Sequence, residues 1–218
     1  MKKLNVLFLF SIILFNILFC FGCNKKRYSI TNSQNAVIEI TIFSSNGKKE
    51  SKGILRNHGH SFFAFTNISQ DFVKIGNYNL SPNETITLGT WSITSHFGVW
   101  YNLESSYIKD YDKYNDRVSV STQIDSNEVK VVNEFIKNHD TWNPYSNCSY
   151  FCINLWNTFA NNEEIIKKPL FYNPSYLYNQ ITSFPTYENN KMVTTKENFG
   201  YFENEFVSHS FLKELSND

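Results

Sequence analysis

Short apolar runs that alternate with polar residues occupy the first half of the chain, and turn residues separate them. Residues 37–43 have the pattern of a strand, and the Asn46-Gly47 pair that follows favours a tight turn. Residues 60–66 form an aromatic-rich strand. Further strands are predicted at 72–75, 85–88 and 98–103. Strands joined by such short turns pair antiparallel, so we expect one antiparallel sheet.

Apolar residues in the second half recur at helical spacing instead. Residues 125–128 have the form of a capping box and predict that a helix begins there. A second stripe, at 148–159, predicts a helix that packs against the sheet. The whole pattern indicates a single α+β domain at residues 36–187, followed by a polar C-terminal tail at 188–218.

The N-terminus has the layout of an export signal. Two lysines precede an apolar run at 4–21, which ends at Gly22-Cys23 before a polar stretch. This order is typical of a bacterial lipoprotein signal peptide, in which residues 1–22 are removed and Cys23 carries the lipid. Residues 23–35 then act as a tether, and the domain lies in the bacterial cell envelope, outside the cytoplasm. An uncleaved N-terminal anchor is the alternative, and it leaves the domain on the same side.

Composition narrows the classes of function. The chain has 20 basic and 20 acidic residues, and removal of Lys2 and Lys3 with the signal leaves a net charge of about −2. That balance argues against a basic surface that binds nucleic acid. The exported part keeps only Cys148 and Cys152 besides Cys23, too few for a disulfide scaffold. Without a phosphate-binding glycine loop or paired metal-ligand motif, we expect no cofactor and no metal, and no obligate protein partner is indicated.

Cys148 stands where the second helix begins, after a loop that contains Pro144 and Asn147. Unpaired amides and the positive end of the helix dipole stabilise a thiolate in a first helical turn. A cysteine nucleophile needs this environment, because the thiolate is the attacking species. The alternative is a cysteine that merely fills the core, which is how we interpret Cys152 one turn later. Their helical spacing disfavours a disulfide between the two.

A histidine that suits this thiol begins the aromatic strand. In Gly59-His60-Ser61-Phe62 the histidine follows a glycine turn, and apolar neighbours shield it from water. His58 points to the same side of an extended chain and is the competing candidate. The cysteine and the histidine are far apart in sequence, so only the fold can bring them together.

The two segments together resemble the circularly permuted papain-like proteins. These are relatives of the NlpC/P60 peptidases and include the lecithin-retinol acyltransferase-like and PPPDE groups. In them a strand histidine precedes an Asn-Cys-x-x-Phe helix, the motif that residues 147–151 match. The resemblance covers residues 55–160 and implies a permuted papain-like fold, with Cys148 as the nucleophile and His60 as the base.

The third member of such a site is a polar residue that orients the imidazole. Two candidates follow His60 in the sequence. His96 begins another aromatic strand, and Asn77 lies in the turn Gly76-Asn77-Tyr78.

The resemblance and the export signal together favour a thiol hydrolase of the bacterial envelope. It would act on amide bonds, with cell-wall peptides of the peptidoglycan type as substrates, and would contact the membrane through the lipid on Cys23. A lipid acyltransferase or lipase of the same superfamily is the first alternative. The second is a catalytically inactive lipoprotein that binds a surface component.

Overall fold

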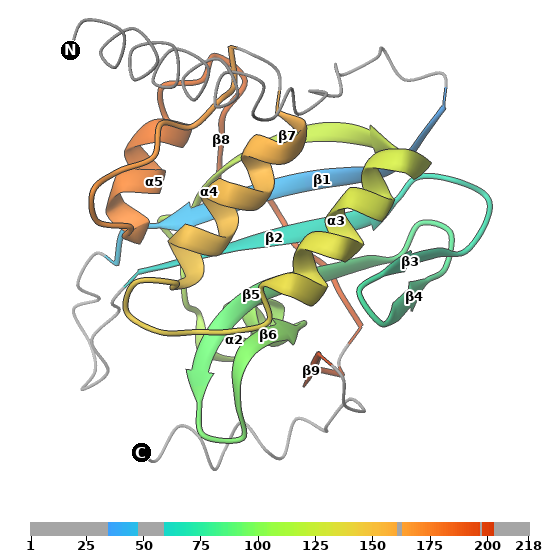
Figure 1. Cartoon of the computed structure of the whole chain (residues 1–218), viewed down its shortest axis with the longest axis horizontal. Coiled ribbons are helices and arrows are strands. Elements are labelled where there is room, and N and C mark those ends of the chain that lie inside the picture. The colour runs from blue at the N-terminus through green and yellow to red at the C-terminus, as the bar shows by residue number, and fades with distance from the viewer. Residues whose placement is uncertain (1–34, 48–58, 161–162, 197, 203–218) are drawn as a thin grey trace, which may run out of the picture.

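A seven-stranded antiparallel sheet forms the centre of the structure (Figure 1). The computed structural model describes residues 35–47, 59–160, 163–196 and 198–202. The strand order is β8-β7-β1-β2-β5-β6-β9. The bounds are β1 (Ala36–Ser45), β2 (His60–Asn67), β5 (Thr85–Ile93), β6 (His96–Tyr101), β7 (Val118–Asp125), β8 (Glu188–Asn189) and β9 (Gly200–Tyr201). A separate hairpin pairs β3 (Val73–Ile75) with β4 (Tyr78–Leu80).

Helices cover both faces of this sheet. In the described residues they are α2 (Leu103–Tyr111), α3 (Ser126–Asn138), α4 (Cys148–Phe159) and α5 (Pro174–Ile181). Side chains of α3, α4 and α5 join those of β1, β2 and β7 in the main core. Helix α2 lies on the opposite face, behind β5 and β6 in Figure 1. The chain is therefore α+β, as the sequence pattern predicts.

The central strand β2 supplies side chains to both faces. Phe63 and Phe65 are buried in the main core, whereas Phe62 and Ala64 are buried in a smaller cluster that Ile108 of α2 covers. A strand that is covered on both faces needs apolar residues at successive positions. This explains why the sequence of β2 is almost continuously aromatic and apolar.

The predicted helix starts are confirmed. At α3, Asp125 Oδ1 accepts hydrogen bonds from the amides of Asn127 and Glu128 at 2.8 and 2.9 Å, and Glu128 Oε2 accepts one from the Asp125 amide at 2.9 Å. Helix α4 begins at Cys148. The predicted strands correspond to β1, β2, β3, β5 and β6, with ends that differ by a few residues.

Several elements of the described residues do not follow from the sequence pattern, namely α2, β7, α5 and the short strands β4, β8 and β9. Helix α2 is the most consequential, because its first turn buries Glu104, Ser105 and Ser106 next to Leu103. A helix that buries mostly polar side chains has a weak apolar stripe, so hydrophobic periodicity does not readily detect it.

The segment predicted as a polar tail begins with residues that pair with the sheet. Residues 188–202 contribute β8 and β9, which pair with β7 and β6 at the two edges of the sheet. Buried Arg117 also holds this segment, since its Nε and Nη2 donate to the Lys191 carbonyl at 3.1 and 2.9 Å. Backbone pairing, one buried arginine and the buried side chains of Phe199 and Phe202 secure these residues. Two apolar residues three positions apart in a polar stretch do not make a strand or helix pattern in the sequence.

Several predictions concern residues that the structure does not describe. The signal peptide, Cys23 and nearly all of the tether fall within 1–34, His58 falls within 48–58, and the end of the chain from 203 is likewise outside the described residues. None of the helices in the described ranges is long and apolar enough to cross a membrane.

Candidate active site

The candidate site lies where two neighbouring strands separate. β2 pairs with β1 as far as His60, and β5 pairs with β6 as far as Ile93. The pairing between β2 and β5 stops earlier, at Phe63↔Leu88. The first residues of β2 therefore border a gap in the sheet, and Figure 1 shows β5 curving away from β2 at this end.

Cys148 reaches the gap from the first turn of α4. Asn147 caps this helix, because its Oδ1 accepts hydrogen bonds from the amides of Ser149 and Tyr150 at 3.0 and 3.1 Å. Asn147 Oδ1 therefore binds the second and third amides of the helix but not the first, which is the backbone N–H of Cys148. The backbone of Ser61 in β2 also hydrogen-bonds the Cys148 sulfur. The start of the helix thus fixes the thiol against the open edge of β2.

His60 lies at the start of β2 and meets the thiol in this gap. It points to the α2 face together with Phe62, whose ring centroid is 6.0 Å from the imidazole centroid. A side-chain hydrogen bond joins His60 to Cys148. His60 is 5% exposed and Cys148 8% exposed. The fold therefore brings together the two residues that the sequence proposes as base and nucleophile.

Glu104 contacts the imidazole from the other side. Its Oε1 lies 3.1 Å from His60 Nε2 and accepts a hydrogen bond from Trp91 Nε1 at 2.7 Å, and its Oε2 accepts one from the Thr87 hydroxyl at 3.0 Å. Asn102 makes this possible, because its φ of 60° turns the chain between β6 and α2 and asparagine tolerates that left-handed conformation. Because Glu104 contacts Nε2 of the His60 ring, the nitrogen that can hydrogen-bond Cys148 is Nδ1.

The electrostatics of the pair favour the charged forms. Burial alone would lower the pKa of His60, but the charge and hydrogen bond of Cys148, and then those of Glu104, raise it to about 9. Burial alone would raise the pKa of Cys148, but the charge and hydrogen bond of His60, and then hydrogen bonds from Ser61 and Ser149, lower it. Each charge therefore stabilises the other, and the thiolate and the imidazolium are both favoured over what burial alone would allow.

Aromatic rings enclose the imidazole. The ring of Trp91 lies 4.1 Å from it and that of Tyr114 lies 5.7 Å from it, centroid to centroid. Burial, and then the charge of Glu104, raise the pKa of Tyr114 well above its ordinary value, so this phenol stays neutral. Rings that exclude water strengthen the attraction between the charges they enclose.

A chain of buried serines ties the nucleophile helix to the sheet. Ser149 Oγ lies 3.0 Å from Ser61 Oγ, which lies 3.0 Å from Ser44 Oγ. Ser44 in turn donates to the carbonyl of Pro174, the first residue of α5, at 2.8 Å. The chain connects β1, β2, α4 and α5 directly beneath the thiol, since Ser149 also hydrogen-bonds the Cys148 sulfur.

The second cysteine of the helix belongs to the core, as predicted. Cys152 is fully buried, and neither it nor Cys148 forms a disulfide. Burial, and then the negative charges of Cys148 and Glu104, raise the pKa of Cys152 well above its ordinary value. We therefore expect these two cysteines, one turn apart, to differ in reactivity, because the charge of His60 lowers the pKa of Cys148 only.

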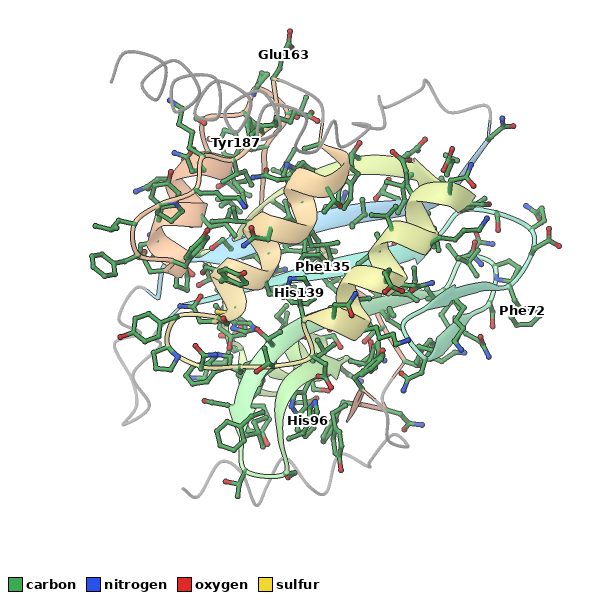
Figure 2. The ribbon with its side chains drawn as sticks, in the orientation of Figure 1. Phe72, His96, Phe135, His139, Glu163 and Tyr187 are labelled. Carbon is green, nitrogen blue, oxygen red and sulfur yellow. The ribbon has the colours of Figure 1, made fainter. Side chains whose placement is uncertain are left out.

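The two residues predicted to orient His60 lie elsewhere. His96 Nε2 is 2.7 Å from Asp140 Oδ1, and its ring stacks on Tyr201 with centroids 4.7 Å apart. Figure 2 shows His96 beside the β5–β6 hairpin, where its bond to Asp140 holds the loop before α4 against β6. Asn77 lies in the β3–β4 turn, and its backbone N–H donates to the Tyr101 hydroxyl at 3.2 Å. The side chain that contacts His60 Nε2 is that of Glu104, and His96 and Asn77 contact other partners.

Another histidine before the helix also stays out of the site. His139, the residue that follows the last turn of α3, stacks on Phe135 of that helix with ring centroids 3.8 Å apart, and Figure 2 shows the two side by side. Glu104 is not among the sequence candidates, because it lies on a helix that the apolar pattern does not predict. Its sequence signal is a carboxylate that directly follows an aromatic strand, at Tyr101-Asn102-Leu103-Glu104.

Comparisons with known proteins provide no independent identification. The chain matches no protein-family model, no curated protein and no solved structure. The argument for function therefore starts from the geometry of Cys148, His60 and Glu104.

Gly89 in β5 provides a steric test of this geometry. A Cβ atom at this position would collide with the Glu104 carboxylate and come within 3.0 Å of His60 Nε2. Gly89→Ala should therefore displace the carboxylate and cost about 1–3 kcal/mol of stability, as overpacking does in a buried site. Denaturant unfolding measures the stability, and alkylation of Cys148 measures the state of the thiol. A variant that is unchanged in both would contradict the placement of Glu104.

Glu104→Gln tests the electrostatic role of the carboxylate. The amide is similar in shape but uncharged, so the imidazolium loses a stabilising charge and the pKa of Cys148 should rise. Where the pKa lies above 6, each unit of increase slows alkylation by iodoacetamide at pH 6 about tenfold, because the thiolate fraction falls by that factor. Peptide mapping reports Cys148 and Cys152 separately.

The matched control for this variant is Glu84→Gln. Glu84 is also a buried carboxylate, and it pairs with Tyr78 and Lys196. Its substitution should leave the alkylation rate of Cys148 as it is in the unmodified chain. Equal rates for Glu104→Gln and the unmodified chain would show that the Glu104 charge has no effect on the thiol.

Proposed function

We propose that this chain is a thiol hydrolase with a permuted papain-like fold, anchored in the bacterial envelope, that cleaves amide bonds of cell-wall peptides. The observation that carries the proposal is the hydrogen-bonded pair of Cys148 and His60, with Glu104 on the far side of the imidazole. A thiolate at a helix start, an imidazole and an orienting carboxylate are the parts that acyl transfer through cysteine requires.

The arrangement of elements supports the fold assignment. The helix that begins with the cysteine packs against an antiparallel sheet, and the histidine lies on a strand that precedes the helix in sequence. This order, histidine before cysteine, is the one that the resemblance to the permuted group implies.

The first chemical step is attack of the Cys148 sulfur on the carbonyl carbon of the substrate. The carbonyl π electrons move to oxygen, and the negative charge that develops there needs a donor. The backbone N–H of Cys148 is suited to this role, because the Asn147 side chain accepts hydrogen bonds from the amides of Ser149 and Tyr150 and not from that of Cys148. The positive end of the α4 dipole adds to the stabilisation.

His60 then moves protons in both halves of the reaction. Its imidazolium gives a proton to the leaving nitrogen as the carbon–nitrogen bond breaks, and a thioester to Cys148 remains. In the second half the neutral imidazole takes a proton from water, which attacks the thioester carbonyl. The products are a carboxylic acid and the free Cys148 thiolate. Glu104 keeps the ring in place and stabilises its charged form throughout.

The choice of substrate rests on the location that the N-terminus predicts and on the kinship with cell-wall peptidases. The same step on an ester would make the protein a lipid hydrolase or, with another acyl acceptor, an acyltransferase. The site itself supports acyl chemistry in general. The choice between amide and ester therefore needs an experiment with both substrate classes.

Turnover of defined substrates tests this function. The full chain should cleave an amide bond in stem peptides released from bacterial cell walls, and mass spectrometry of the products locates the bond. Cys148→Ser should reduce the rate at least about 10³-fold, as loss of a nucleophile does. Cys152→Ala is the matched thiol control and should keep the activity.

The alternatives give different results in the same experiment. Cleavage of phospholipid esters without cleavage of stem peptides would replace the peptidase assignment with a lipid hydrolase. If neither class is turned over while Cys148 is readily alkylated at pH 6, the chain is a surface-binding lipoprotein and the hydrolase proposal is wrong.

A further inference from the structure

Three large apolar side chains are exposed on the two loops that meet at the start of α4. Tyr145 is 81% exposed, Leu170 88% and Phe171 70%. Tyr145 lies in the loop that leads to Cys148, and the other two lie in the segment that leads to α5. Adjacent exposed leucine and phenylalanine side chains are unfavourable in water, and such positions mark surfaces that bind something.

The side chain of Asn147 holds both loops at the candidate site. Its Nδ2 donates to the Pro144 carbonyl at 3.2 Å and to the Tyr172 carbonyl at 2.9 Å. The residue that caps the nucleophile helix therefore also fixes the backbone next to Tyr145 and Phe171. Figure 1 shows the orange segment before α5 close to the first turn of α4.

The base of the second loop is also fixed, so its exposed side chains are presented on a defined backbone. Asn157 of α4 accepts from the Ile166 amide at 3.0 Å and donates to the Ile166 carbonyl at 2.7 Å. The Tyr176 hydroxyl donates to the Lys167 carbonyl at 3.0 Å. Leu170 and Phe171 lie between these anchors and the Tyr172 carbonyl that Asn147 binds.

The charges next in sequence to Leu170 and Phe171 are positive. Lys167 and Lys168 are exposed and immediately precede Pro169, Leu170 and Phe171. Glu163 and Glu164 begin the same segment, but residues 141–162 and 165–187 contain no aspartate or glutamate. The stretch from Lys167 to Phe171 is therefore apolar and positively charged.

We propose that Tyr145, Leu170 and Phe171, together with Lys167 and Lys168, dock on a lipid bilayer that contains anionic phospholipid. The apolar side chains enter the interfacial region, and the ammonium groups pair with lipid phosphates. A protein partner fits less well, since lysine is depleted in protein–protein interfaces. The docking goes beyond the proposed hydrolase. Only one consequence, that substrate reaches Cys148 at a membrane surface, rests on that function.

Tryptophan quenching by lipid tests the docking directly. Phe171→Trp places a probe in the docking surface, and Phe72→Trp is the matched control, because Phe72 is 74% exposed and lies at the opposite end of the molecule from α5 in Figure 2. Both full-length variants are mixed with vesicles of brominated phosphatidylcholine, prepared with and without phosphatidylglycerol. The emission that each variant adds to that of the unmodified chain is recorded. The N-terminal segment is the same in both, so it cannot produce a difference between them.

The expected result is loss of the added emission at position 171 in vesicles that contain phosphatidylglycerol, with little loss at position 72. Reversing both charges, in Lys167→Glu/Lys168→Glu, should weaken the quenching, since each lysine near an anionic surface is worth about a fivefold change in binding. The proposal is overturned if the tryptophan at position 171 is quenched no more than that at position 72. It is also overturned if quenching at position 171 changes neither with phosphatidylglycerol nor with the reversal of the two lysine charges. Absence of quenching would show that this surface does not dock on lipid, and its ligand would then be a protein or a glycan.

Alkylation of Cys148 in the same variants keeps the two proposals separate. If Cys148 reacts normally but the tryptophan is not quenched, the docking proposal is wrong and the hydrolase proposal stands. Quenching without reactivity at pH 6 removes the hydrolase and leaves the docking surface.

Discussion

The charge pair between Cys148 and His60 is the interaction on which the site depends, and it exists because the sheet opens between β2 and β5. The imidazole lies on the α2 face of β2, whereas α4, which carries the thiol, packs on the other face. In a continuous ladder the backbone would separate them. Pairing that stops at Phe63↔Leu88 lets helices on opposite faces contribute to one site.

Burial makes the pair unstable without further support. Removing a thiolate and an imidazolium from water costs several kcal/mol per ion, and only close pairing with full hydrogen bonding offsets this. Glu104 supplies a second negative charge next to the imidazolium, and Trp91 and Thr87 donate to its carboxylate. Buried polar groups such as these are hydrogen-bonded in native proteins because an unpaired one is costly. The donors on β5 are thus as necessary to the geometry as the residues that contact the thiol.

The sequence predicts those parts of the site that local rules govern. Helix capping and apolar periodicity locate Cys148 at the start of α4, and a glycine turn before an aromatic strand locates His60. Glu104 does not follow from such rules. It lies on a helix that buries mostly polar side chains, and its contact with His60 depends on the left-handed turn at Asn102. His96 has the residue type expected of a site member, but tertiary packing pairs it with Asp140.

The ionisation of His60 tests the central claim most directly. In the full-length protein, a nuclear magnetic resonance titration of the His60 ring should give a pKa of about 9, against an ordinary value of 6.5. Cys148→Ala removes the negative charge that raises this pKa and leaves the burial that lowers it. The imidazole should therefore lose its proton at a distinctly lower pH in the variant. A His60 that titrates near 6.5 in the unmodified protein, or at the same pH in both proteins, would contradict the thiolate–imidazolium pair.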